Sequence, residues 1–398
     1  MQHAQSRARS RRWIGRGALV ALAGAAVFGF SPALSALAAT WSSPVALPGS
    51  CGTSVAVNQA GVMAAGGTFT ASGGTANVEV CTSTNGTTWQ ATDLGPGGGI
   101  VVAVTPAGQT VALWSSTVLE AAVRPAGGSW GAPVTLSTSQ SGGLVLGVDG
   151  SGNVIAGWVG SGDDVTDAVL PAGSSSWGPA TALSTANDQG VAHDISMAVN
   201  SGGSAIIMFN GGLNNLWAIS GTVTGGFSAP VDVASGAGSH SYIRSGTSAV
   251  ALNNAGQASV AWMVLDGQTG LLTRTPSGTW SDHILNARTA PAIPVSTAID
   301  GAGNAIAVIG SSYSWHLAGG SWQTPAALPS GSSGGLAVAD PAGTFVYADT
   351  TGNAFTFTAG ATSFGTGSGS HTSLGGLKIV PGQAVLLAAN AVSTEPVS

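Results

Sequence analysis

Charged residues are scarce in this chain, at 7% of 398 residues. Beyond residue 38 the chain keeps five cations and all 16 acids, so its net charge there is 5 − 16 = −11. Binding to nucleic-acid phosphates requires clustered cations that displace counterions, and an anionic membrane surface attracts the same kind of cluster. Five scattered cations do not supply one. The composition therefore argues against nucleic acid and against a membrane surface as partners.

Long apolar runs and cysteines are also few. Beyond residue 38 no segment is long and apolar enough to span a bilayer, so we expect no membrane insertion of the processed chain. The only cysteines are Cys51 and Cys81. In an exported protein such a pair can form one disulfide or remain two separate small residues, and the sequence leaves both open.

The N-terminal segment 1–38 has the three parts of a secretory signal peptide. Five arginines precede residue 17, an apolar stretch covers residues 17–30, and Ala36-Leu37-Ala38 supplies a small-residue cleavage site. The stretch Ser10-Arg11-Arg12-Trp13-Ile14 also resembles a twin-arginine signal, which would mean export of a folded chain. We therefore predict a signal peptide at 1–38 and a single secreted, extracellular domain at 39–398, which we expect to be a monomer.

Glycine, by contrast, is abundant at 62 residues, and eight glycines close a turn that recurs along the chain. Each turn follows a short apolar strand, and most copies contain Asn or Asp, whose side chain can hydrogen-bond the backbone ahead. The copies recur at similar intervals over the whole length beyond the N-terminal segment. The closing glycines are Gly61, Gly108, Gly152, Gly203, Gly256, Gly303, Gly343 and Gly382.

An aromatic residue recurs between these turns, after a Gly/Ser-rich segment and usually before a proline. The turn glycines and the aromatics alternate along the chain, eight of each. Their mean period of about 46 residues leaves room for four short strands, which is typical of a propeller blade. Prolines two or three residues after the aromatic place the fourth strand at an outer edge, where a missing N–H is tolerated. The aromatics are Trp41, Trp89, Trp130, Trp177, Phe227, Trp280, Trp322 and Phe364.

The sequence therefore predicts an all-β fold, a β-propeller of eight four-stranded blades. In the second unit we predict strands at 100–104, 110–115, 119–124 and 130–136. The chain starts on a fourth strand (41–47), so this N-terminal strand would complete the last blade and close the ring without a covalent link. Seven blades are the alternative if residues 374–398 pack differently. An open solenoid is disfavoured, because it gives no reason for split first and last units.

The turn Ser83-Thr84-Asn85-Gly86-Thr87-Thr88-Trp89 resembles the Asp-box of sialidase-type bacterial propellers, with Asn85 in place of Asp and one residue fewer before Gly86. The resemblance implies the propeller class and a structural role for the turn. It also raises the alternative of a sialidase-like, glycan-active enzyme, which would need an arginine triad and a Tyr/Glu pair. Four arginines spread over several units, and only three glutamates, argue against this alternative, and we assign no catalytic residue.

Four aromatics six residues after a turn glycine are candidate ligand-binding residues. They end the second strand of consecutive units, near the face where propellers usually bind ligands. Such rings can stack on sugars, and they can equally wedge between neighbouring blades as buried core residues. These residues are Trp114, Trp158, Phe209 and Trp262.

Polar residues gather in two connections predicted at the same face. Insertions that depart from a repeat tend to lie at the binding face, although a solvated polar loop has the same composition. The candidates are Asp188, His193, Asp194, His240, Tyr242 and Arg244. Separately, Asp163, Asp164 and Asp167 could hold Ca²⁺ through carboxylate oxygens, although their spacing does not match a Ca²⁺ loop and an exposed acidic turn is the alternative.

These features favour a secreted binding module over an enzyme. Its predicted ligand is a carbohydrate or a surface protein, and no cofactor is expected apart from that Ca²⁺ candidate. A structural or interaction protein of the envelope, without a small ligand, is the remaining alternative.

Overall fold

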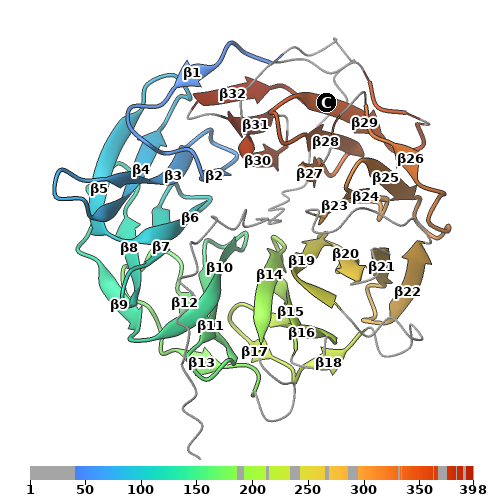
Figure 1. Ribbon diagram of the computed structural model, residues 1–398, viewed down its shortest axis with the longest axis horizontal. Coiled ribbons are helices and arrows are strands. Elements are labelled where there is room, and N and C mark those ends of the chain that lie inside the picture. The colour runs from blue at the N-terminus through green and yellow to red at the C-terminus, as the bar shows by residue number, and fades with distance from the viewer. Residues whose placement is uncertain are drawn as a thin grey trace, which may run out of the picture.

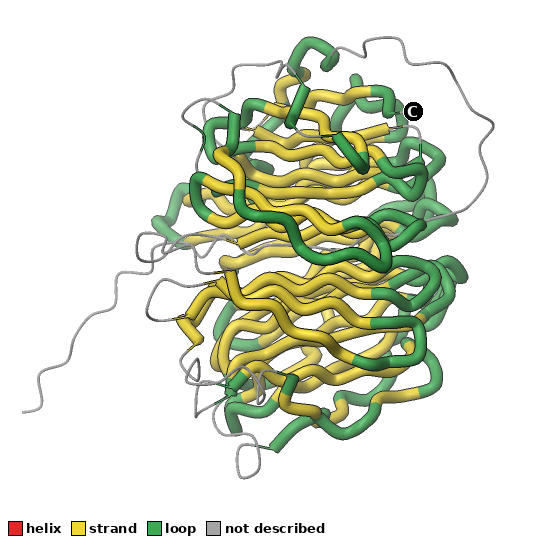
Figure 2. Tube along the Cα trace, turned by 90° about the vertical axis from the view of Figure 1, so that its right-hand side faces the viewer, coloured by secondary structure: helices red, strands yellow, loops and turns green. Residues whose placement is uncertain are grey.

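The computed structural model describes residues 41–397 except 186–191, 212–214, 234–242, 265–268, 286–294, 330–331, 333, 362, 366–373, 382 and 389–390. The described residues form 32 strands and no helix, arranged as eight sheets around a ring (Figures 1 and 2). The predicted eight-bladed β-propeller is thus confirmed, and the seven-bladed alternative is wrong. The predicted signal peptide lies outside the described residues, within which no helix could cross a membrane.

The first four blades follow one another along the chain, each running from an inner strand to an outer strand. Blade 1 comprises β2 (Ser54–Val57), β3 (Met63–Thr70), β4 (Ala76–Ser83) and β5 (Gln90–Pro96). Blade 2 comprises β6 (Gly98–Val104), β7 (Thr110–Ser115), β8 (Leu119–Arg124) and β9 (Val134–Ser137). Blade 3 comprises β10 (Gln140–Val148), β11 (Val154–Gly160), β12 (Val165–Leu170) and β13 (Thr181–Ala182). Blade 4 comprises β14 (His193–Val199), β15 (Ser204–Asn210), β16 (Leu216–Thr222), β17 (Gly226–Phe227) and β18 (Val231–Asp232).

The last four blades repeat this order, and the final one borrows its outer strand from the N-terminus. Blade 5 comprises β19 (Ile243–Leu252), β20 (Ala258–Val264), β21 (Thr269–Arg274) and β22 (Trp280–Leu285). Blade 6 comprises β23 (Val295–Ile299), β24 (Ala305–Ile309), β25 (Ser312–His316) and β26 (Ala326–Ala327). Blade 7 has β27 (Leu336–Ala339), β28 (Thr344–Ala348) and β29 (Ala354–Thr358) among the described residues. Blade 8 comprises β30 (Leu374–Val380), β31 (Gln383–Ala388), β32 (Ala391–Glu395) and β1 (Val45–Ala46).

The strands of blade 2 test the sequence prediction residue by residue. Its two middle strands, β7 and β8, have the predicted bounds, and β6 begins two residues earlier than predicted. The outer strand β9 begins at Val134 rather than at Trp130. Pro133 directly precedes it, and since proline has no N–H to donate, the regular pairing begins only after that residue.

The ring is closed by the N-terminal strand, as predicted. Residues Val45 and Ala46 of β1 pair with Val392 and Ala391 of β32. The Ser42 backbone N–H donates to the Thr394 carbonyl oxygen at 2.8 Å, and the Thr394 N–H donates to Ser42 Oγ at 2.9 Å. No peptide bond joins these strands around the ring, so hydrogen bonds and side-chain packing hold the seam.

The inner turns link each blade to the next. In blade 4 the Asn200 side chain accepts a hydrogen bond from the Ser204 N–H and donates one to the Asn253 carbonyl oxygen of blade 5. Asn253 repeats this arrangement toward Asp300 of blade 6. The glycine that closes such a turn has a positive φ, for example +85° at Gly108, a conformation that residues with a side chain rarely adopt. The recurring Asn/Asp and Gly therefore form and connect the turns.

One disulfide joins Cys51 to Cys81, which resolves the alternative that the sequence left open. Cys51 lies between the closing strand β1 and the inner strand β2, and Cys81 lies on β4. The bond therefore ties the segment that follows the closing strand to the middle of blade 1.

Replacing both cysteines with alanine is expected to lower the free energy of unfolding by about 3 kcal/mol, since the bond closes a loop of 30 residues in the unfolded chain. Urea denaturation of the two proteins measures the difference. Adding a reductant should destabilise the wild type by a similar amount and leave the double variant unaffected, because the chain has no other cysteine. Equal stability of the two proteins would contradict this prediction.

Candidate functional site

The four aromatics predicted as ligand platforms lie inside the propeller. Trp114, Trp158, Phe209 and Trp262 are each at most 1% exposed. Each packs with residues of the preceding blade, in four successive blade interfaces. No ring face is accessible to a sugar, so the stacking interpretation is corrected in favour of the alternative, a wedge between blades. The physical reason is that a large aromatic gains most by burial where two twisted sheets meet.

The polar candidates fall mainly in or beside segments outside the described residues. Asp188, His240 and Tyr242 lie outside them, and Arg244 lies on the inner strand β19. His193 and Asp194 begin β14, where the pairing with β15 is irregular, and Asp194 has a positive φ of 44°. The structure therefore places three of these residues on inner strands, and a ligand-binding role for the group stays a prediction.

The three carboxylates predicted to hold Ca²⁺ have different surroundings. Asp163 and Asp164 lie in the loop between β11 and β12, whereas Asp167 is buried in the middle of β12. Within the described part of the chain, no group of three or more His, Cys, Asp or Glu is placed to hold a metal ion. The geometry gives the Ca²⁺ interpretation no support, and it directs attention to Asp167 alone.

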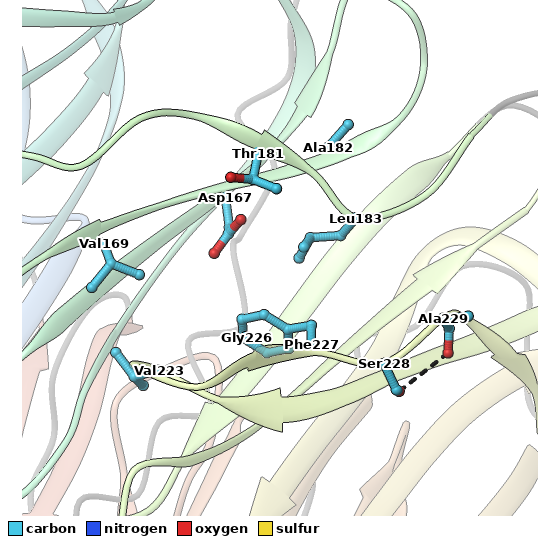
Figure 3. A pocket seen from close by; sticks show the side chains of 10 residues that line it. All are labelled: Asp167, Val169, Thr181, Ala182, Leu183, Val223, Gly226, Phe227, Ser228 and Ala229. Atoms are coloured by element: carbon cyan, nitrogen blue, oxygen red, sulfur yellow. Dashed lines mark hydrogen bonds between the residues drawn. The ribbon is translucent and has the colours of Figure 1, made fainter.

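Asp167 lines a groove of about 440 Å³ between the outer parts of blades 3 and 4. Val169 of β12 and Thr181 of β13 form one wall with it, and Val223, Phe227 and Ser228 of blade 4 lie opposite. Figure 3 shows the Asp167 carboxylate and the Phe227 ring facing each other across this space. A volume of this size lies in the range of small-ligand sites.

Asp167 departs from the repeat at a position that is otherwise hydrophobic. In every blade the residue five after the turn glycine pairs with one residue of the third strand, and in blade 3 that pair is Gly157 and Asp167. The seven equivalent partners are all buried and aliphatic or aromatic, so Asp167 is the one charged member of the set. They are Val80, Ala121, Ala218, Leu271, Tyr313, Ala354 and Val392.

The buried position changes the titration of Asp167. Its side chain is 6% exposed, and loss of hydration raises its pKa from 3.8 to about 6, against a smaller opposing effect of a hydrogen bond with its own backbone. The carboxylate is therefore still mostly ionised at neutral pH, in a site that penalises its charge. Such a group is typical of functional sites, since a packed core gains nothing from it.

Asp167→Asn is expected to stabilise the protein at neutral pH and to leave its stability nearly unchanged at about pH 4. Between about pH 4 and pH 6 the folded protein holds a proton that the unfolded chain has released, so the contribution of Asp167 falls as the pH rises through this window. The difference should reach at most roughly 3 kcal/mol above pH 6. Urea denaturation of both proteins across this range measures it. A difference that does not vary with pH would contradict the prediction.

A second groove lies on the other side of the outer part of blade 3. It has a volume of about 410 Å³ and is lined by residues of blades 2 and 3 that include Val134, Leu136, Ala168 and Trp177. None of its lining residues is ionisable. These two grooves are thus similar in size, and of the two the groove at Asp167 adds a buried charge.

Eight sheets around a closed ring, with a charged groove between two outer edges, define an eight-bladed β-propeller with a candidate binding site at its rim.

No family model and no curated protein sequence matches the chain. Among solved structures it is similar to Saccharomyces cerevisiae Sqt1, with a TM-score of 0.60 and 11% identity over 89% of this chain and 98% of that one. These findings leave the resemblance to Asp-box propellers without further support.

Two bacterial propellers are similar to a comparable degree. BamB from Moraxella catarrhalis has a TM-score of 0.55 and 14% identity, covering 91% of this chain and 98% of that chain. The BP39L lectin from Burkholderia pseudomallei has a TM-score of 0.54 and 14% identity, covering 81% of this chain and 99% of that chain. At such identities the likeness establishes the propeller fold alone.

Sequence reasoning missed Asp167 as a groove residue, although a signal was present. In blades 3, 4 and 5 the third-strand position follows the turn glycine at one constant interval, and the chain has Asp167, Ala218 and Leu271 there. Comparison of these three units would have shown a carboxylate among hydrophobic residues. Across all eight units the interval is not constant, because the loops between the second and third strands differ in length.

Proposed function

We propose that this protein is a secreted binding propeller whose ligand is a carbohydrate, bound in the groove at Asp167. The observation that carries this proposal is the buried carboxylate in a groove where the other seven blades have hydrophobic residues. The partly buried Phe227 ring offers an apolar surface to the C–H face of a sugar. The Thr181 and Ser228 hydroxyls and the carboxylate offer hydrogen bonds to its hydroxyl groups.

Several further observations agree with a binding role. One of the similar propellers is a lectin. The segment 1–38 has the features of a signal peptide, which would bring the propeller to extracellular glycans. The two arginines with described side chains, Arg124 and Arg274, lie on the third strands of blades 2 and 5 rather than at the groove. Binding therefore fits the groove better than the sialidase-like alternative.

A glycan array with the mature protein, residues 39–398, tests this proposal. Asp167→Ala introduces the residue that blades 2 and 4 have at this position, so the variant should fold. Loss of a hydrogen bond to a charged group should weaken binding roughly ten- to hundred-fold. Asp282→Asn, on the exposed outer strand β22, is the matched control and should bind as the wild type does. No glycan binding, or equal binding by Asp167→Ala, would contradict the proposal.

A further inference from the structure

The groove at Asp167 has an unbalanced charge. Of the residues that line it, Asp167 alone is ionisable, and the others supply aliphatic groups, one phenyl ring and the Thr181 and Ser228 hydroxyls. No lysine, arginine or histidine is among them. A ligand that fills the groove must therefore meet one negative charge that the lining does not neutralise.

The chemistry of a buried carboxylate decides which ligand gains most from this groove. A neutral ligand would displace water from a carboxylate that burial already penalises, and its hydroxyl groups would donate hydrogen bonds but leave the negative charge uncompensated. A ligand ammonium group would donate a hydrogen bond in which both partners are charged, and it would also neutralise the carboxylate in a site of low effective dielectric. Electrostatics therefore favours a cationic group at this position over a hydroxyl or an acetamide.

The opposite wall suits the same ligand. The Phe227 ring faces the Asp167 carboxylate across the groove (Figure 3). Its face can pack against the C–H groups of a sugar, and its negative quadrupole also attracts a nearby cation. Over a longer range, the net charge of −11 beyond residue 38 attracts cationic ligands toward the protein.

We propose that the Asp167 groove selects an amino sugar with a free, protonated amino group, held against the Asp167 carboxylate and packed on Phe227. The inference rests on the carbohydrate-binding function proposed above and narrows its ligand class. It assigns Asp167 as the residue that determines specificity, since hydroxyl groups and a phenyl face recognise sugars in general.

Three tetrasaccharides of β-1,4-linked glucose type that differ only at carbon 2 test this inference. One carries the free amine, one the acetamide and one the hydroxyl group. Titration calorimetry near pH 6.5 should show the amine form binding about tenfold tighter than the other two. Asp167→Asn should remove this preference, whereas Asp282→Asn should retain it. Raising the salt concentration should weaken the amine form most.

The pH dependence gives a second readout. Affinity for the amine form should fall as the pH drops through about 6, where Asp167 gains a proton, and no other lining residue titrates. If the three tetrasaccharides bind equally, or if Asp167→Asn keeps the preference for the amine, this inference is overturned while the glycan array still decides the binding function. If no glycan on the array binds, both proposals fail.

Discussion

Deleting residues 39–47 from a chain of residues 39–398 is expected to lower the free energy of unfolding by roughly 4–6 kcal/mol. The deletion removes the buried Leu47 side chain and the hydrogen bonds that join Ser42 and β1 to β32. It also exposes the edge of β32, and an unpaired edge strand promotes association between molecules. Urea denaturation and size-exclusion chromatography of the full and shortened mature chains measure the two effects.

Because the closure is non-covalent, a synthetic peptide of residues 39–48 should restore part of the lost stability when it is added to the shortened chain. Ser42→Ala is the matched control, since it keeps the strand pairing and removes only the bonds that Ser42 Oγ accepts from the Thr394 N–H and, at 3.4 Å, from Thr394 Oγ1; it should cost about 1 kcal/mol. A shortened chain that stays monomeric and as stable as the full one would show that blade 8 does not need β1.

Trp262→Ala should lower the free energy of unfolding by about 3–5 kcal/mol, because it empties a fully buried site between blades 4 and 5. The ring lies against Gly270, its partner on β21, where a Cβ atom would clash with it. Gly270→Ala should therefore destabilise the protein as well. Chemical denaturation of both variants measures these losses.

Trp262→Phe provides the control for this prediction. Blade 4 has Phe209 at the same position, and the Trp262 Nε1 atom has no hydrogen-bond partner, so the change removes volume and little else. Its cost should stay near 1 kcal/mol, in the range of modest core substitutions. If Trp262→Ala abolished ligand binding without loss of stability, the ring would be a ligand platform, which is one of the two interpretations that the sequence left open.

The fold could be predicted from the sequence because the same pattern of turn glycine and marker aromatic recurs eight times along the chain. Turn glycines and alternating apolar strands gave the blade count, and the isolated outer strand at residues 41–47 gave the closure. The bounds of the outer strands were predicted least accurately, because their pairing is short and begins only after a proline. Pro133 in blade 2 is an example. The repeat did not show whether the Trp158 side chain is buried, because periodicity does not distinguish a position between two blades from one on the surface.

The candidate site could be predicted only in part. Asp167 drew attention through its neighbours Asp163 and Asp164, and this proximity in sequence suggested a metal loop. Side chains alternate between the two faces of β12, and this alternation directs the Asp167 side chain into the groove beside blade 4. The sequence identified Phe227 as one of the recurring aromatics. Its position opposite Asp167 depends on how blades 3 and 4 pack together, and no sequence pattern indicates that packing.

A crystal structure of the mature protein with the free-amine tetrasaccharide tests the central claim most directly. The account predicts a sugar residue between β12 and Phe227, with its amine nitrogen about 3 Å from the Asp167 carboxylate. A tetrasaccharide bound elsewhere on the ring, with the Asp167 groove empty, would contradict it.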